Sequence, residues 1–551
     1  MAVTKPATVG TIIAVMSNDA NPSQTIKESV ETAIREATAL AQSARFDEAE
    51  ATCMAAARDL GDHAELWKCL GAVRHHRGDS ANAAAAFQKA VDLAPDDAGA
   101  WSSLGLMLAT ADRSGEAIAA LRKALEIDPG QTAAARNLGL SLMKSGKPAE
   151  ARDVYRTLAA QLPNDADVLG WLGHASAAAD DIDTAYAAYK RSLQIQPGNQ
   201  NLELTLALVE RDLGLFPASR SRFDRLLAAR PDDPVLRFAQ AQNFLLQGDF
   251  VNGFREYEWR WKRPGMEVPE FNAVPWQGED VAGKTFLLHD EQGLGDTIQF
   301  CRFAATLRDK GAAVTLLVRP RLRRLISSLS PNASQDIAVI DTVPPGASFD
   351  FHCPLMSIPY RLGMTLADIP APQAYLTAED ELIAQWRPKL AEWSGGKLAV
   401  GLNWQGDPSS QSERGRSLPF DALRGLLALE GIHFFLLQKQ HGRDALAGIA
   451  DLPNVTDLGD ALDLGDDAFV DTAAVMHCLD IVVTSDTGPA HLAGAIGARS
   501  WVLLKKVPEW RWGTAGSAMP WYPTMRLFRQ SVRGDWSGPV REIANALKTS
   551  L

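Results

Sequence analysis

The residues best suited to chemistry lie in short loops that follow apolar, strand-like runs. The first loop is Gln292–Asp296 (QGLGD), after a strand expected at Thr285–His289. Its two glycines, Gly293 and Gly295, would let the backbone approach a ligand, and the helix expected next would point its free amides there. Asp296 has two interpretations: a helix cap that accepts from those amides, or a base that takes a proton from an acceptor hydroxyl. The residues alone leave both open.

The second loop is Ser485–His491 (SDTGPAH), which also follows an apolar strand. Pro489 suits the first turn of a helix, whose amides would form, with the Thr487 hydroxyl, a site for a phosphate or diphosphate. Asp486 would repel a phosphate, so we expect it to bind a ribose hydroxyl or to orient the loop. His491 either donates to a phosphate or packs within the helix. The candidate donor-binding residues here are Asp486, Thr487, Gly488, Pro489 and His491.

Two further strand ends carry polar and basic residues. Asn403–Asp407 (NWQGD) ends one expected strand, and Arg414 and Arg416 follow it. An arginine at the mouth of a cleft can grip a phosphate or carboxylate with two hydrogen bonds, although a solvated basic loop is the alternative. Lys439, at another strand end, is a candidate contact to a phosphate or a candidate base. The donor-binding candidates from these loops are Trp404, Gln405, Arg416, Gln438 and Lys439.

Other chemistries find no support in the sequence. No group of residues has metal-ligand spacing, and neither a Ser-His-Asp order nor a Gly-x-Ser-x-Gly elbow is present, which disfavours a metal site and a hydrolase. The five cysteines are scattered and form no Cys-x-x-Cys pair, so reduced, buried thiols are expected rather than disulfides or zinc ligands. They are Cys53, Cys69, Cys301, Cys353 and Cys478.

Short apolar runs that alternate with helix-length segments surround these loops. After Lys284 this rhythm predicts two parallel sheets covered by helices, that is, two Rossmann-like halves joined by a helix at Glu379–Trp393. Ligands of such sheets bind at the carboxyl ends of the strands, so the loops above would face one cleft. The expected strands are Thr285–His289, Ala313–Val318, Ala338–Ile340, Asp350–Cys353, Leu398–Trp404, His433–Gln438, Asp480–Thr484 and Ser500–Leu504.

The first half of the chain repeats itself every 34 residues, which is the period of the tetratricopeptide repeat, a pair of antiparallel helices. The repeating prolines are Pro95, Pro129, Pro163, Pro197 and Pro231. Small residues that allow two helices to approach closely keep the same step at Gly71, Gly105, Gly139 and Gly173. Bulky residues, expected to pack into the neighbouring unit, keep it at Phe87, Leu121, Tyr155 and Tyr189. Six to seven repeats would form a superhelix.

Such arrays present a curved surface to another protein. The first helix of each pair is expected to line the groove, which would be partly apolar, with Trp171 and His174 near its middle. Trp171 either packs within the solenoid or anchors a helical or extended segment of a partner. The candidate groove residues are Leu106, Arg136, Asn137, Leu140, Trp171, His174 and Leu208.

Composition sets further limits. A net charge of −12 argues against nucleic acid as the main partner. The apolar run Val9–Met16 is too short and too weakly preceded by basic residues for a signal peptide, and no run approaches the ~20 apolar residues of a membrane span. A cytoplasmic protein without stable membrane insertion is expected. The expected divisions are a tail at 1–27, repeats at 28–264, a Pro/Gly-rich linker at 265–283, and halves at 284–378 and 397–551 around a connecting helix at 379–396.

Several motifs resemble the glycosyltransferase family 9 (heptosyltransferase-like) domains, whose two Rossmann-like halves form the GT-B fold. They are QGLGDTIQFCRF, VGLNWQGDP with RGRSLP, FLLQK, DTGPAHLAGAIGARSWVLL, WRWG and PWYPTMRLFRQ. The whole layout resembles bacterial proteins in which tetratricopeptide repeats precede such a domain, some of which are flagellin glycosyltransferases. It is also similar in layout to O-GlcNAc transferase, although the catalytic motifs are less so.

The resemblance implies an inverting, metal-independent transfer from a nucleotide-activated sugar, with no cofactor. It makes Asp296 the base and the DTGPAH segment the donor-phosphate site. It further implies a CMP-linked nonulosonic acid, of the pseudaminic or legionaminic type, as the donor, and Ser/Thr of flagellin as the acceptor. The alternatives are a transferase acting on lipopolysaccharide or another glycan, and a non-catalytic repeat scaffold or chaperone.

Overall fold

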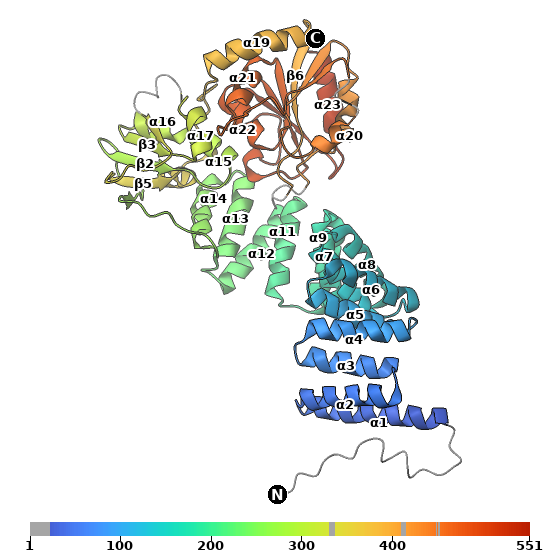
Figure 1. Ribbon diagram of the computed structural model, residues 1–551. Helices are drawn as coiled ribbons and strands as arrows, with labels where there is room; N and C mark the ends of the chain where they lie inside the picture. The colour runs from blue at the N-terminus through green and yellow to red at the C-terminus, as the bar shows by residue number, and fades with distance from the viewer. Residues whose placement is uncertain (1–21, 330–336, 409–414, 448, 450–451) are drawn as a thin grey trace. The chain divides into compact units, whose positions relative to one another are not determined.

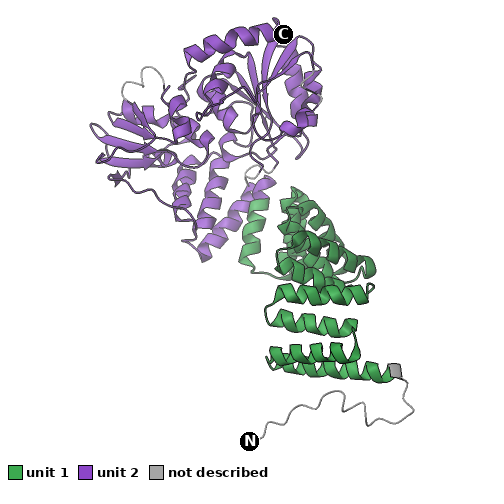
Figure 2. Ribbon diagram, viewed as in Figure 1, with its two compact units in different colours: residues 1–209 green, residues 210–551 purple. Residues whose placement is uncertain are grey.

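The chain forms two compact units, residues 1–209 and 210–551, which we describe separately (Figures 1 and 2). The computed structural model describes residues 22–329, 337–408, 415–447, 449 and 452–551. The apolar run Val9–Met16 and Arg414 lie outside the described residues. In the part of the chain that is described, no helix is both long enough and apolar enough to cross a membrane.

The first unit is an α-helical tetratricopeptide-repeat solenoid, as the 34-residue period predicts. It begins with α1 at Pro22, six residues before the predicted start of the repeats. Its helices are α1 (Pro22–Gln42), α2 (Phe46–Leu60), α3 (Ala64–His76), α4 (Ser80–Leu93), α5 (Ala98–Thr110), α6 (Ser114–Ile127), α7 (Thr132–Lys144), α8 (Pro148–Gln161), α9 (Ala166–Ala178), α10 (Ile182–Ile195) and the start of α11 (Gln200–Asp212).

The periodic glycines are sites of close helix contact, as predicted. A Cβ atom added to Gly71 would lie 2.8 Å from the ring of Phe87, and at the equivalent glycines the partner is closer still. The bulky residue therefore packs against the glycine of its own repeat, and Leu121 and Tyr155 also share a hydrophobic cluster with residues of neighbouring repeats. The pairs are Gly71 with Phe87, Gly105 with Leu121, Gly139 with Tyr155 and Gly173 with Tyr189.

Two glycines in α9 should respond oppositely to the same substitution. In Gly173→Ala the new methyl group would meet the buried Tyr189 ring, and overpacking of this kind costs about 1–3 kcal/mol. Gly170→Ala adds a methyl group with no atom within 4 Å, so only the helix preference of alanine, about 1 kcal/mol, remains. We expect urea unfolding of the full chain to show a lower midpoint for the first variant and an equal or higher one for the second. Equal destabilisation by both would contradict the proposed ring contact.

The second unit begins inside the helical region, at Glu210, and not where the repeats end. Its helical part comprises the end of α11, α12 (Phe216–Ala229), α13 (Pro234–Leu246), α14 (Phe250–Tyr257) and a 3₁₀ helix, η3 (Glu258–Lys262). Buried aromatic residues of α14 pack on the α/β part: the ring centroids of Phe254 and Trp510 are 5.7 Å apart, and those of Phe250 and Trp521 are 6.0 Å apart. The last repeat therefore shares a hydrophobic core with the α/β part.

The α/β part contains two sheets whose strands are all parallel, in the orders β1-β5-β2-β3-β4 and β11-β10-β9-β6-β7-β8. This confirms the predicted pair of parallel sheets, while the GT-B assignment stays a prediction. The strands are β1 (Val274–Pro275), β2 (Thr285–His289), β3 (Ala313–Leu317), β4 (Ile337–Ile340), β5 (Phe351–Pro354), β6 (Leu398–Asn403), β7 (Ile432–Leu436), β8 (Val455–Asp457), β9 (Ile481–Ser485), β10 (Ser500–Leu504) and β11 (Met525–Arg529).

Helices cover both faces of the second sheet (Figure 1). One face packs on α20 and α23, and the other on α19, α21 and α22. The α-helices of the α/β part are α15 (Leu294–Phe300), α16 (Phe303–Asp309), α17 (Pro320–Ile326), α18 (Ile358–Arg361), α19 (Asp380–Ser394), α20 (Phe420–Leu427), α21 (Val470–Cys478), α22 (Gly488–Ala495) and α23 (Ser537–Lys548).

The predicted linker at 265–283 is built into the first sheet. Its residues Val274–Pro275 form the edge strand β1, paired in parallel with β5. Trp276 is buried, and its ring meets that of Phe286 edge to face at 5.4 Å. Trp276 therefore anchors the segment to the sheet.

Candidate functional site

The two glycine-bearing loops meet in the second unit. The loop Gln292–Asp296 follows β2, and Ser485–His491 follows β9, so both lie at the carboxyl ends of their sheets. A Cβ atom on Gly295 would lie 2.9 Å from Cδ2 of His491 and 3.4 Å from Cα of Gly488. A glycine is therefore required where the beginnings of α15 and α22 touch, and the structure brings together two motifs almost 200 residues apart.

One carboxylate oxygen of Asp296 caps a helix, as one of the two interpretations predicted, and the other oxygen pairs with an arginine. Its Oδ2 accepts a hydrogen bond of 2.8 Å from the amide of Gly293, which caps α15. Its Oδ1 forms an ion pair with Arg511, and 20% of the side chain stays exposed. The cap and the ion pair together engage both carboxylate oxygens, while the exposed part of the side chain keeps Asp296 reachable by an acceptor hydroxyl.

Arg511 connects three polar side chains and was absent from the sequence-based site. It lies in the 3₁₀ helix Trp510–Trp512, pairs with Asp296 and Glu509, and donates from Nε to Oε1 of Gln299 at 2.6 Å. Burial raises the pKa of Glu509 to about 7; the carboxylates of Asp486 and Asp296 act in the same direction, and the Arg511 charge opposes them. The WRWG motif was the sequence signal for this arginine.

Asp486 and Arg416 form the next ion pair. An Nη2 of Arg416 lies 3.0 Å from Oδ1 of Asp486 and also donates to its backbone carbonyl. The Asp486 side chain is almost fully buried, and its Oδ2 has no hydrogen-bond partner among the described residues. Arg416 thus holds the start of the DTGPAH loop, and one buried carboxylate oxygen remains available to a hydroxyl donor.

A buried polar network connects the ends of β6, β7 and β9. The amide Nδ2 of Asn403 donates to Oε1 of Gln438 at 3.0 Å, and the Thr487 hydroxyl donates to Oδ1 of Asn403 at 3.0 Å. Oε1 of Gln438 also accepts from the backbone amides of Trp404 and Gln405. The predicted ligand contacts Gln438 and Thr487 therefore already serve as a scaffold that fixes the two loops.

Two residues that were predicted to bind the nucleotide-sugar donor have structural roles instead. Trp404 is buried in the core against Phe420, with ring centroids 4.7 Å apart, so its side chain faces the interior and not a ligand. The ammonium group of Lys439 donates to the backbone carbonyls of Leu462 (2.6 Å) and Asp463, so it holds a neighbouring loop. Both residues are corrected from donor contacts to structural positions.

His491 is a packing residue whose ring is neutral. It is buried, its Nδ1 lies 3.0 Å from the Tyr522 hydroxyl, and it stacks on Trp512 at 5.4 Å. Burial, with smaller contributions from the charges of Arg511, Arg416 and Arg302, holds its pKa well below the usual range. The structure therefore supports the packing interpretation over donation to a phosphate.

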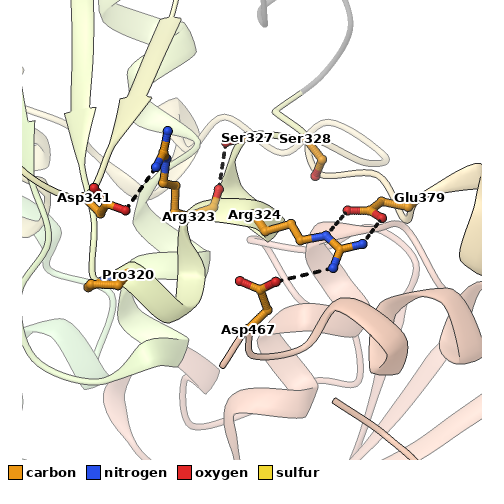
Figure 3. Close-up of a pocket in the computed structure, with 8 residues that line it drawn as sticks. All are labelled: Pro320, Arg323, Arg324, Ser327, Ser328, Asp341, Glu379 and Asp467. Atoms are coloured by element: carbon orange, nitrogen blue, oxygen red, sulfur yellow. Dashed lines mark hydrogen bonds and ion pairs between the residues drawn. The ribbon is translucent and has the colours of Figure 1, made fainter. Parts of the chain in front are cut away.

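A separate hollow in the same unit has a volume of about 570 Å³ and contains mostly paired charges (Figure 3). Arg324 on α17 pairs with Glu379, at the start of α19, and with Asp467 at 3.3 Å. Arg323 pairs with Asp341 at 3.1 Å. The ion pairs of Arg324 join the first sheet region to the second, which favours a structural connection between the halves over a ligand site.

The predicted groove residues lie on the first helices of their repeats. Leu106 and Leu140 are 37% and 50% exposed. Trp171 is half-buried and near Tyr155, yet it also lines a cavity of about 190 Å³ with His174. His174 Nδ1 lies 2.8 Å from the Tyr189 hydroxyl. Trp171 thus combines the two interpretations, packing and exposure to a partner.

The remaining groove candidates lie on the first helices of neighbouring repeats and do not line this cavity. The guanidinium group of Arg136 lies 5.9 Å from the Trp171 ring, and Asn137 and Leu208 are half-buried. No group of three or more potential metal ligands occurs within the described ranges.

Comparison with known proteins supports the assignment of the tetratricopeptide repeats, and one similar protein also matches the chain beyond the repeats. Tetratricopeptide-repeat models match residues 34–98, 77–132, 108–172 and 204–264. Protein FlbA of Caulobacter vibrioides is 25% identical over 502 residues, covering 88% of this chain and 84% of FlbA. The match to FlbA therefore includes the α/β part as well as the repeats.

Three solved structures of similar proteins each cover a minority of this chain. PilF of Pseudomonas aeruginosa is 18% identical and covers 39% of this chain and 99% of its own, with a TM-score of 0.33. MamA of Desulfovibrio magneticus RS-1 is 19% identical and covers 31% and 97%, with a TM-score of 0.29. A repeat protein of Cytophaga hutchinsonii is 13% identical and covers 42% and 96%, with a TM-score of 0.36.

Proposed function

We propose that this protein is an inverting, metal-independent glycosyltransferase that moves a sugar from a nucleotide-activated donor to Ser/Thr of a protein. The observation that carries the proposal is the meeting of the two loops at the carboxyl ends of two parallel sheets. There the starts of two helices, two arginines and three carboxylates converge on one place. Such a place suits a ligand with a charged phosphate and a reacting hydroxyl.

Some residues at this place suit binding of the nucleotide-sugar donor, and others suit the transfer reaction itself. The amides at the start of α22 and the guanidinium of Arg416 suit the donor phosphate, and the unpartnered Oδ2 of Asp486 suits a ribose hydroxyl. Asp296 would take the proton of the acceptor hydroxyl as that oxygen attacks the anomeric carbon. Arg511, which holds both Asp296 and Glu509, would keep these carboxylates in position.

The repeats are the basis for proposing that the acceptor is a protein. Tetratricopeptide repeats present helix faces to peptides and proteins, and here exposed leucines and the Trp171 cavity offer apolar anchors. The resemblance described above makes flagellin the proposed acceptor and a CMP-linked nonulosonic acid the proposed donor.

Thermal unfolding with CMP, UDP, GDP and ADP tests the nucleotide site. A nucleotide at about 100 times its dissociation constant stabilises the state that binds it by roughly 2.7 kcal/mol. We expect a rise in Tm with CMP alone. Arg416→Gln should remove the rise because it loses the grip on the DTGPAH loop, while Arg424→Gln, an exposed arginine paired with Asp421 on α20, should keep it.

The other outcomes separate the alternatives. A rise with UDP, GDP or ADP would keep a transferase but change the donor class. A donor that is consumed without any gain in mass of a protein acceptor would favour a glycan or lipopolysaccharide acceptor. No rise with any of the four nucleotides would favour the non-catalytic scaffold or chaperone.

A further inference from the structure

Two cysteines of the first two repeats lie next to each other. Cys53 on α2 and Cys69 on α3 are 16 residues apart in sequence, and their Sγ atoms are 3.6 Å apart. Cys53 is buried, whereas Cys69 is half-buried and therefore accessible to small molecules. The sequence predicted isolated, scattered thiols, and only the packing of successive helices brings this pair together.

The repeat pattern explains why there is room for the second sulfur. Cys53 stands at the 34-residue position that later repeats fill with bulky residues, among them Phe87, Leu121 and Tyr155. Its small side chain leaves space beside α2, and the neighbouring cluster contains small residues such as Ala37 and Ala49. Cys69 of the next repeat occupies the edge of this space.

We propose that Cys53 and Cys69 are a redox modification site, at which a hydroperoxide converts the two thiols into a reversible disulfide joining the first two repeats. The sulfur atoms of a disulfide are about 2.05 Å apart, so they must approach by only about 1.5 Å. Since α2 and α3 already pack together, rotation of the two side chains supplies most of that movement.

Cys69 is the thiol that reacts first. Cys69 is the more exposed of the two, and the Cys53 thiol donates a hydrogen bond to its sulfur, which lowers the pKa of Cys69 against the opposing effect of burial. The Cys69 thiolate attacks one oxygen of the hydroperoxide, the O–O bond breaks, and an alcohol or water leaves. The product is a sulfenic acid on Cys69.

Cys53 completes the reaction. Its sulfur, losing its proton, attacks the Cys69 sulfenic sulfur and displaces hydroxide, which leaves as water with that proton. Over both steps the two thiols lose two electrons to the hydroperoxide. An organic hydroperoxide yields one alcohol and one water molecule, and hydrogen peroxide yields two water molecules. The other buried thiols, Cys301 and Cys353, have their pKa values raised by burial and are expected to stay reduced.

The bond would act on the end of the solenoid. Among the described residues, the first repeat packs on one neighbouring repeat, so it gains fewer stabilising contacts than an internal repeat does. A disulfide between α2 and α3 would tie this repeat to the next one and raise the temperature at which the repeats begin to unfold.

The test is a titration of the full chain with hydrogen peroxide, followed by alkylation and peptide mass analysis without reductant. We expect a peptide pair linked through Cys53 and Cys69, lighter by two hydrogen atoms and restored by dithiothreitol, at peroxide doses that leave Cys301 and Cys353 alkylated. In Cys53→Ala the sulfenic acid on Cys69 should persist and be trapped by dimedone. In Cys69→Ala, Cys53 should stay alkylated at the same doses.

Two results would overturn the proposal. One is oxidation of Cys69 to the sulfinic acid with no linked peptide in the unaltered chain. The other is oxidation of Cys301 or Cys353 at the same dose as Cys69, which would show general damage rather than a dedicated pair. Circular dichroism of the oxidised chain checks that the helices remain folded.

Discussion

Asp296→Asn is expected to lower the rate of sugar transfer by a factor of about 10²–10⁴, the usual contribution of a positioned general base. Asparagine can still accept the hydrogen bond from the Gly293 amide, so the cap of α15 is kept, while the proton acceptor and the ion pair with Arg511 are lost. The Tm rise with CMP should therefore remain, and transfer, measured as the gain in mass of the acceptor protein, should fall.

The matched control is Asp290→Asn, six residues earlier on the same loop. Asp290 also pairs with an arginine, since its Oδ2 lies 3.0 Å from Nε of Arg319. It has no contact with Arg511 among the described contacts, so we expect little change in transfer. If Asp296→Asn transfers sugar as fast as the unaltered chain, Asp296 is a helix cap only, and capping accounts for about 0.5–2 kcal/mol of stability without any role in the reaction.

Much of this fold follows from local patterns. The strands β2 and β10 lie at the predicted residues because each is a continuous apolar run, which is typical of a strand buried on both faces. The strands β1, β8 and β11 were missed because they are short or lie at sheet edges, and β11 (MRLFR) carries two arginines. An edge strand needs less apolar surface, so its pattern is weaker.

The arrangement of the site could be predicted only in part. Asp296 and the DTGPAH loop were found because glycines and helix starts have local signatures. Arg511 was missed as a site residue because its partner Asp296 is 215 residues away, and such a pairing depends on how two sheets pack. Trp404 was misplaced for a related reason: whether a residue at a strand end faces a ligand or the core depends on strand register, which the sequence leaves open.

Removing the repeats of the first unit should abolish acceptor modification and leave nucleotide binding intact, provided that the truncated chain retains the whole second unit. A chain that begins at Gln200 keeps α11–α14 and the core they share with the α/β part. We expect this chain to show the Tm rise with CMP and to lose modification of the acceptor protein, because Leu106, Leu140 and the Trp171 cavity are gone. Modification at an unchanged rate would rule out the groove as the acceptor site.

A cut at the end of the repeats should instead unfold the protein. A chain that begins at residue 265 lacks the buried rings Phe250, Phe254 and Tyr257, and losing one such ring costs about 3–5 kcal/mol. It also lacks Arg260, which donates two hydrogen bonds of 2.7 Å to the buried Glu291, and an unpaired buried charge costs a further ~3–5 kcal/mol. Together these losses equal or exceed the roughly 5–15 kcal/mol that keeps a domain folded, so only the chain from Gln200 should show a cooperative thermal transition. A folded, CMP-binding chain from residue 265 would contradict the shared core and place the functional boundary at the end of the repeats.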